Sequence, residues 1–157
     1  MRDATLIFLV KREKDTISDI CLAVKKRGFG KDRFNGFGGK VEVGESIEDA
    51  VRRETEEECG VILTNLEKHG EIEFTFPHNL DFNQRVHIYL SSEWNGDPVE
   101  TEEMSPSWMN VLDIPYHKMW ADDIFWLPHV LDGKKVRGKF TFAEGDIVKE
   151  QEVIIIK

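Results

Sequence analysis

The sequence lacks features that would place it in several protein classes. It has only two cysteines, Cys21 and Cys59, in 157 residues, too few for the disulfide framework of a small secreted domain. Its longest apolar runs, such as residues 153–156, are far shorter than the roughly 20 residues that cross a bilayer. No apolar segment followed by a cleavage site opens the chain. We therefore expect a cytoplasmic protein with free thiols and no membrane partner.

The sequence also lacks an excess of basic residues. Its 21 Lys and Arg stand against 30 Asp and Glu, a formal net charge of −9, which argues against a broad basic surface for duplex nucleic acid. There is no internal repeat, low-complexity tract or Pro/Ser-rich linker. With 40% hydrophobic residues, the chain has the composition of a globular core. We expect one domain over residues 1–157, and a monomer.

The acidic excess is concentrated in two short segments. Residues 39–61 hold eight acids and three bases, and residues 97–103 hold four acids and no base. Their charges of −5 and −4 equal the net charge of the whole chain. Acidic clusters of this kind are either solvated faces or cation sites.

The apolar pattern predicts a mixed α/β fold of two or three layers. Ser46 and Gly60 supply the cap residues of the clearest helix, over residues 46–59. A second helix over 122–131 contains Pro128, which makes its middle uncertain. The charged stretch 11–19 is interpreted as a hairpin connection, and the predicted strands cover residues 5–10, 20–24, 72–76, 86–90, 138–142 and 151–156.

The helix over 46–59 carries carboxylates on its apolar side. On a helical wheel, Glu54 and Glu58 fall within the stripe that contains Ile47 and Val51, and Glu57 lies at its edge. Burying such groups unpaired costs several kcal/mol, on the order given for isolated buried charges. Either Arg or Lys side chains neutralise them, or the helix is amphipathic in the opposite sense, or a hard divalent cation binds them. Oxygen-only donors favour Mg²⁺ or Mn²⁺ over zinc.

The surroundings of this helix favour phosphate chemistry. A magnesium site with few carboxylates keeps positions for water and substrate phosphates. The glycine turn at residues 36–39 lets backbone approach such a site, because glycine has no Cβ. The basic run at residues 25–27 supplies positive charge, although a solvated turn is the alternative. Metal-assisted chemistry at a phosphate is the function that this pattern favours.

The acidic segment 39–61 contains a set of residues with a defined spacing: Gly39, Glu45, Arg53, Glu54, Glu57, Glu58, Cys59, Gly60 and Val61. This pattern resembles the box of the Nudix hydrolase family. One departure is Thr55, at a position that is usually aliphatic in the family, where we expect only a packing adjustment. Segments 25–30, 33–41, 96–104 and 119–126 resemble the branch of the family that acts on oxidised purine nucleoside triphosphates, so the likeness covers nearly the whole chain.

The resemblance implies a fold, a cofactor and a reaction. The fold is the family's α/β/α sandwich around a mixed β-sheet. The Gly38 carbonyl and the three box carboxylates bind Mg²⁺, with Mn²⁺ possible, and Glu103 reaches the metal site. Glu45 and Arg53 pair structurally. Water attacks a nucleoside triphosphate such as 8-oxo-dGTP or 2-hydroxy-dATP to give the monophosphate and pyrophosphate, and either Glu58 or Glu103 is the base.

The resemblance also implies a purine pocket. Two adjacent acids, Asp122 and Asp123, read the base through different protonation states, one donating and one accepting a hydrogen bond. Their alternative role is to cap the second helix, and the aromatic residues are alternatively core. The further substrate-binding residues are Thr5, Lys25, Phe29, Asn35, Phe37, Gly38, Gly39, Lys40, Phe74, Met104, Trp120 and Trp126.

Two other functions remain open from the sequence. One is hydrolysis of another nucleoside diphosphate derivative such as ADP-ribose. The other is a non-catalytic nucleotide-binding module, which typically loses box carboxylates that this chain retains. A second departure, Gln84 in place of an apolar pocket residue, is expected to shift the preferred base.

Overall fold

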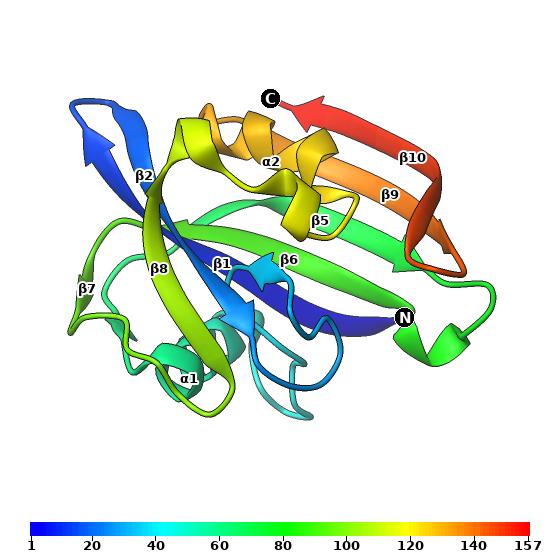
Figure 1. The fold of residues 1–157 in the computed structure, drawn as a ribbon, viewed down its shortest axis with the longest axis horizontal. Helices are drawn as coiled ribbons and strands as arrows, with labels where there is room; N and C mark the ends of the chain where they lie inside the picture. The colour runs from blue at the N-terminus through cyan, green and yellow to red at the C-terminus, as the bar shows by residue number, and fades with distance from the viewer.

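A mixed β-sheet with one helix on each face makes up the molecule. The computed structural model describes all residues, 1–157. The helices are α1 (Ile47–Cys59) and α2 (Asp123–Leu131) (Figure 1). The strands are β1 (Arg2–Glu13), β2 (Thr16–Lys25), β3 (Phe34–Asn35), β4 (Ile62–Leu63), β5 (Glu67–Thr75), β6 (Gln84–Ser91), β7 (Trp94–Asn95), β8 (Met104–Asn110), β9 (Lys135–Ala143) and β10 (Ile147–Ile156). Neither helix is long and apolar enough to cross a membrane.

The main sheet has eight strands in the order β10-β9-β5-β6-β1-β2-β3, with β8 also paired to β2. The pairs β1–β6 and β5–β9 are parallel and the other pairs are antiparallel. The short strands β4 and β7 form a separate pair. The mixed sheet predicted from the sequence is therefore confirmed.

Alternation along β1 divides the core between the two faces of the sheet. Phe8 and Val10 belong to the cluster that contains Trp126 of α2, whereas Ile7 and Leu9 belong to the cluster that contains the side chains of α1. Successive side chains of a strand point to opposite faces. The two helices therefore cover opposite faces of one sheet, which is the expected sandwich.

The helix α1 begins and ends where the sequence predicts. Ser46 is the N-cap, and its hydroxyl accepts a hydrogen bond from the backbone N–H of Asp49 at 3.1 Å. Gly60 ends the helix in the left-handed conformation, at φ 79°, and its N–H donates to the carbonyl of Glu56. A left-handed residue at this position suits glycine because it has no Cβ.

The helix α2 continues through Pro128 to Leu131. Trp126, Leu127 and Val130 are fully buried against the sheet. This burial stabilises the helix despite the hydrogen bond that proline cannot donate. The proline therefore does not break the element.

Two parts of the sequence interpretation are corrected by the structure. The charged stretch 11–19 is mostly strand, because β1 extends to Glu13 and β2 starts at Thr16, so only two residues form the connection. The strand β8 was not predicted. Its sequence contains Pro106, and apart from the buried Met104 its side chains are half-buried or exposed, so it shows no clear alternation.

Candidate active site

A cavity of about 400 Å³ lies between the sheet, the glycine turn and the N-terminal end of α2, and 25 residues line it. Most of the predicted substrate-binding residues are among them. These are Thr5, Lys25, Phe29, Asn35, Gly38, Gly39, Lys40, Phe74, Met104, Trp120, Asp122, Asp123 and Trp126, together with Glu58 of α1. The cavity thus joins the box carboxylate to the purine-pocket segments.

One predicted substrate-binding residue lies elsewhere. Phe37 is fully buried in the cluster on the α1 side and does not line the cavity. Its backbone pairs with that of Ile7 in both directions, at 2.7 and 2.9 Å. Phe37 therefore holds the glycine turn against β1 by packing.

The structure adds lining residues that the sequence did not single out. They are Arg2, Ala4, Leu6, Asp81, Phe82, Val86 and Phe142. They come from strand ends and a loop that are far apart in sequence. Only the register of the sheet brings them together, so no local motif signals them.

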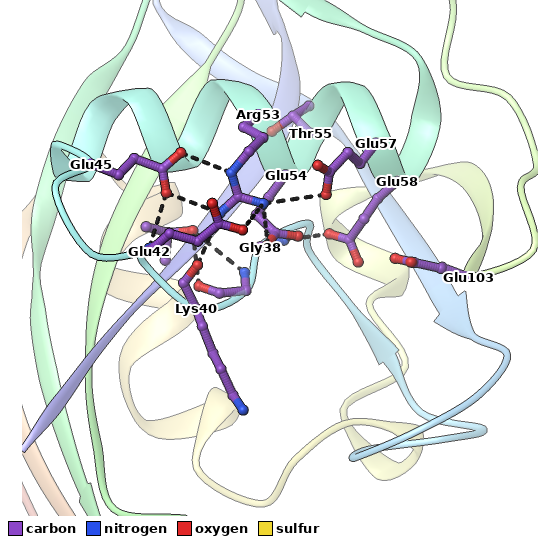
Figure 2. Close-up of polar contacts among 12 residues, drawn as sticks. Gly38, Lys40, Glu42, Glu45, Arg53, Glu54, Thr55, Glu57, Glu58 and Glu103 are labelled. Atoms are coloured by element: carbon purple, nitrogen blue, oxygen red, sulfur yellow. Dashed lines mark hydrogen bonds and ion pairs between the residues drawn. The ribbon is translucent and has the colours of Figure 1, made fainter.

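Arg53 is the centre of a polar network on α1 (Figure 2). Its guanidinium donates to both carboxylate oxygens of Glu45, at 2.8 and 3.0 Å, and to the carbonyl of Lys40 at 3.0 Å. It also contacts Glu54 at 2.9 Å and Glu57 at 3.3 Å. The expected Glu45–Arg53 pair is present, and Arg53 also neutralises part of the acidic cluster, as the ion-pair alternative requires.

Glu58 has no such cationic partner. It is buried, and its Oε1 accepts a hydrogen bond from the backbone N–H of Gly38 at 2.7 Å. Burial raises the pKa of Glu58 to about 8, with smaller contributions from the nearby charges of Glu54 and Glu103, while Lys25 acts in the opposite direction. A buried carboxyl with a pKa near neutrality is typical of a functional site.

Glu54 and Glu103 complete the acidic group. The side chain of Glu54 lies against Gly39, where an added Cβ would come within 2.6 Å of its carboxyl group. Burial raises the pKa of Glu54, and the charges of Glu57 and Glu103 raise it further. Figure 2 shows Glu103 reaching toward Glu58 from the loop before β8.

The loop that carries Glu103 is fixed to the end of α1. The Thr101 hydroxyl donates to the carbonyl of Glu58 at 2.9 Å and accepts from the N–H of Glu103 at 3.2 Å. On its other side, Arg27 lies 3.6 Å from the Glu103 carboxylate. The two acidic segments of the sequence therefore meet in space.

The opposite end of the cavity contains two buried acids. Asp122 and Asp123 are each 3% exposed. The indole N–H of Trp126 donates to Asp122 Oδ2 at 2.7 Å, and Asp122 makes no capping bond to α2. Burial raises the pKa of Asp122 to about 6, and burial together with the charge of Asp122 raises that of Asp123 still further above its usual range.

The two acids have different partners. Asp122 accepts from the Trp126 indole, whereas burial and the charge of Asp122 raise the pKa of Asp123 well above its usual range, which favours the protonated form of Asp123. Asp123 Oδ2 is buried without a hydrogen-bond partner. The Asp122 side chain makes no capping bond, so the helix-cap alternative is wrong for it, and burial favours the protonated form of both acids.

Aromatic side chains form the mouth of the cavity. Phe29 lies between Trp120 and Phe82, with ring centroids 4.9 and 4.5 Å away. The guanidinium of Arg33 lies 4.1 Å from the centre of the Trp120 ring and donates to Asp146 at 2.7 Å. These contacts hold Trp120 in place in the wall of the cavity.

The comparisons with known proteins agree with this site. The family described as NUDIX domain matches residues 1–130. The chain belongs to the Nudix family. It is an enzyme of the hydrolase class.

Two Nudix relatives match most of the chain, and both are named oxidized purine nucleoside triphosphate hydrolase. The protein from Danio rerio is 43% identical over 134 residues, which cover 85% of each chain. The protein from Mus musculus is 41% identical over 147 residues, 92% of this chain and 88% of that one. The mutator MutT protein of Bacillus halodurans has the same fold, with a TM-score of 0.83 and 22% identity over 98% of this chain and 97% of that one.

The departure from the Nudix box at Thr55 has a simple structural account. Thr55 is fully buried, and its hydroxyl donates to the carbonyl of Val51 at 2.7 Å. The polar atom is satisfied within the helix, so this threonine packs where an aliphatic side chain would. The position does not contact the cavity.

Nudix hydrolases typically use divalent metal ions. No three His, Cys, Asp or Glu side chains of this structure are grouped as a preformed metal site. The donor chemistry nevertheless fits such an ion, because the charges of Glu57 and Glu103 raise the pKa of Glu54, and those of Glu54 and Glu103 raise the pKa of Glu58. Oxygen donors with uncompensated negative charge suit Mg²⁺.

Proposed function

We propose that this chain hydrolyses oxidised purine nucleoside triphosphates, such as 8-oxo-dGTP or 2-hydroxy-dATP, to the monophosphate and pyrophosphate. Such a reaction removes oxidised purines from the nucleotide pool. The observation that carries the proposal is one cavity with Glu58 and Gly38 at one end and the buried acids Asp122 and Asp123 at the other. The names of the Danio rerio and Mus musculus relatives support it.

Mg²⁺, with Mn²⁺ as a substitute, would be held by the Gly38 carbonyl and by the carboxylates of Glu54, Glu57, Glu58 and Glu103. When bound, the ion supplies charge neutralisation for the polyphosphate and acidifies the attacking water. Lys25 and Lys40 line the same end of the cavity and offset further phosphate charge. Arg53 holds Glu54 and Glu57 in place through its guanidinium.

Glu58 is the group best suited to accept the proton of water. It lines the cavity and has no cationic partner, so its carboxylate is available to a water molecule in the cavity. The N–H of Gly38 fixes its Oε1. Glu103 is the second candidate base, because it lies near Glu58. Its side chain is more exposed than that of Glu58.

The base end recognises the purine by complementary hydrogen bonds. Asp123 donates through its proton, Asp122 accepts, and Asn35 adds a further amide in the same cavity. Trp120 and Phe29 line the cavity and offer aromatic contact to the ring. A pair that holds one proton can shift it between its members, which lets one pocket accept both an oxidised guanine and an oxidised adenine.

We further propose that residues 1–157 act as a single domain, as a monomer in the cytoplasm, with a nucleoside triphosphate as the partner. No nucleic acid or membrane partner is part of this proposal. The acidic net charge fits it, since the excess lies in the two segments that would meet the cation.

A substrate panel tests the proposal. Pyrophosphate release is measured with Mg²⁺ for 8-oxo-dGTP, 2-hydroxy-dATP, dGTP and dATP, and phosphate-containing products are measured for ADP-ribose. We expect kcat/KM for at least one oxidised purine to exceed that of its unmodified counterpart by about tenfold or more, the gain that a site built to bind an added polar group provides. Equal rates across the triphosphates, or faster cleavage of ADP-ribose, would overturn it.

A further inference from the structure

Two polar side chains lie next to each other on the sheet floor of the cavity. Arg2 of β1 is in register with Gln84 of the parallel strand β6, and Gln84 is in register with Phe74 of β5. All three line the cavity. Neighbouring strands are about 4.8 Å apart, so Arg2, Gln84 and Phe74 form one row across the floor.

Both polar side chains have unused hydrogen-bonding capacity. Arg2 Nε is buried and has no hydrogen-bond partner. Arg2 makes no ion pair within 4.0 Å, and the side-chain amide of Gln84 makes no hydrogen bond within the protein. A buried donor without an acceptor costs free energy, and native structures retain very few of them. Such a group calls for a partner that arrives with the ligand.

The rest of this floor is apolar. Ala4 and Leu6 follow Arg2 on the same face of β1, and Val86 follows Gln84 on β6. Asp122 and Asp123 belong to a different wall, at the start of α2. The cavity therefore has polar groups on two walls. A purine base that hydrogen-bonds to the two aspartates can also contact the apolar floor and the side chains of Arg2 and Gln84.

Resting on the proposed function, we propose that Arg2 and Gln84 form a second recognition point for the base, donating hydrogen bonds to the exocyclic oxygen that oxidation adds to a purine. The guanidinium has donors only, so its partner must be an acceptor. The amide of Gln84 also supplies an N–H. An unmodified purine lacks the added oxygen and leaves these donors unpaired.

The acceptor is an oxygen of the base rather than a phosphate. Asp81, in the loop before β6, lines the cavity at this end, and its charge disfavours a polyphosphate there. The cationic residues that face the proposed phosphate site, Lys25 and Lys40, come from other segments. Arg2 and Gln84 are therefore expected to bind an uncharged hydrogen-bond acceptor.

Matched variants test the role of the row. Gln84→Met removes the amide and keeps the volume, and Arg2→Met removes the guanidinium. Their controls are Gln151→Met, on the exposed strand β10, and Arg85→Met, which pairs with Asp3 and Glu73 outside the cavity. Two quantities are measured for each: kcat/KM for an oxidised purine and its unmodified counterpart, and Kd of the two monophosphates.

We expect each test variant to lower the preference for the oxidised nucleotide about tenfold, the effect of one lost hydrogen bond to an uncharged group. The loss should appear in KM and in Kd of the monophosphate, with kcat little changed, and the two controls should keep the wild-type preference. An unchanged preference in both test variants that remain folded by circular dichroism would overturn the inference. A wild-type enzyme without any preference would instead overturn the proposed function.

Discussion

The backbone N–H of Gly38 donates a hydrogen bond to the Glu58 carboxylate at 2.7 Å, which joins the glycine turn directly to α1. The contact fixes the one box carboxylate that is both buried and without a cationic partner. Gly38 and Glu58 both line the cavity. The proposed chemistry depends on this junction.

Replacing Glu58 with Gln should abolish most turnover while the fold is kept. The amide oxygen still accepts from Gly38, but the group can no longer take a proton or carry charge. We expect kcat to fall by about 10² to 10⁴, the range for loss of a general base. Pyrophosphate release measures it, with Glu56→Gln on the exposed side of α1 as the control. Turnover close to wild type would refute the role given to Glu58.

The Gly39→Ala variant should act on Glu54 without straining the backbone. The new Cβ would lie 2.6 Å from the Glu54 carboxyl group, and Gly39 has no left-handed conformation that a side chain would oppose. Glu54 must therefore move. We expect the Mg²⁺ concentration for half-maximal rate to rise by roughly tenfold, as when a metal site loses its correct ligand placement. An unchanged Mg²⁺ requirement would show that Glu54 does not help to bind the ion.

Replacing Arg53 with Lys should loosen the box although the charge is kept. Lysine cannot reproduce the two-pronged bond to Glu45. We expect Tm to fall by about 2 to 4 °C, the shift for a loss near 1 kcal/mol in a domain of this size. Thermal unfolding followed by circular dichroism checks it, with Arg52→Lys, an exposed neighbour on α1, as the control. Equal Tm values for the two variants would contradict the structural role.

The buried aspartates predict a pH dependence of stability. Burial raises the pKa of Asp122 to about 6 and that of Asp123 as well, so the folded state binds more protons than the unfolded state above the ordinary carboxyl pKa. Stability should therefore fall as pH rises from about 5 to 8, by a contribution on the order of 2 kcal/mol. Glu58 acts in the same direction, because its pKa is also raised.

The Asp123→Asn variant isolates the contribution of the pair. Asparagine is neutral at every pH, so the fall in urea midpoint between pH 5 and 8 should become smaller than in the wild type. The variant Asp15→Asn, in the exposed turn between β1 and β2, should leave the pH profile as it is. If both variants keep the wild-type slope, Asp123 is not the group that holds the proton.

Patterns of residues close together in the sequence predict much of the fold, and also the part of the site that contains Glu54 and Glu58. The periodicity of residues 46–59 predicted α1, its caps and the inward direction of Glu54 and Glu58, because these depend on a repeat within one helix. Alternating apolar residues predicted most strands of the sheet. The connection at 11–19 was interpreted wrongly because charged residues also occupy the exposed ends of strands.

The base end of the site depended on tertiary structure. Nothing within the helix signals that Asp122 accepts from Trp126 or that Asp123 is buried, since both depend on α2 packing against the sheet. Phe37 illustrates the same limit, because its position in a motif resembling a binding loop did not reveal that its side chain points into the core.

From the sequence alone come both helices, most of the strands, the family resemblance and the charge pattern, since each is encoded by residues close together in the chain. The tertiary structure decided which charges stay unpaired: Arg53 neutralises Glu54 and Glu57, while Glu58 does not receive a cation. It also decided that Arg2 lies beside Gln84, because a parallel pairing of strands more than 80 residues apart sets their register. Burial and pairing are properties of assembled surfaces, and they fix protonation and specificity here.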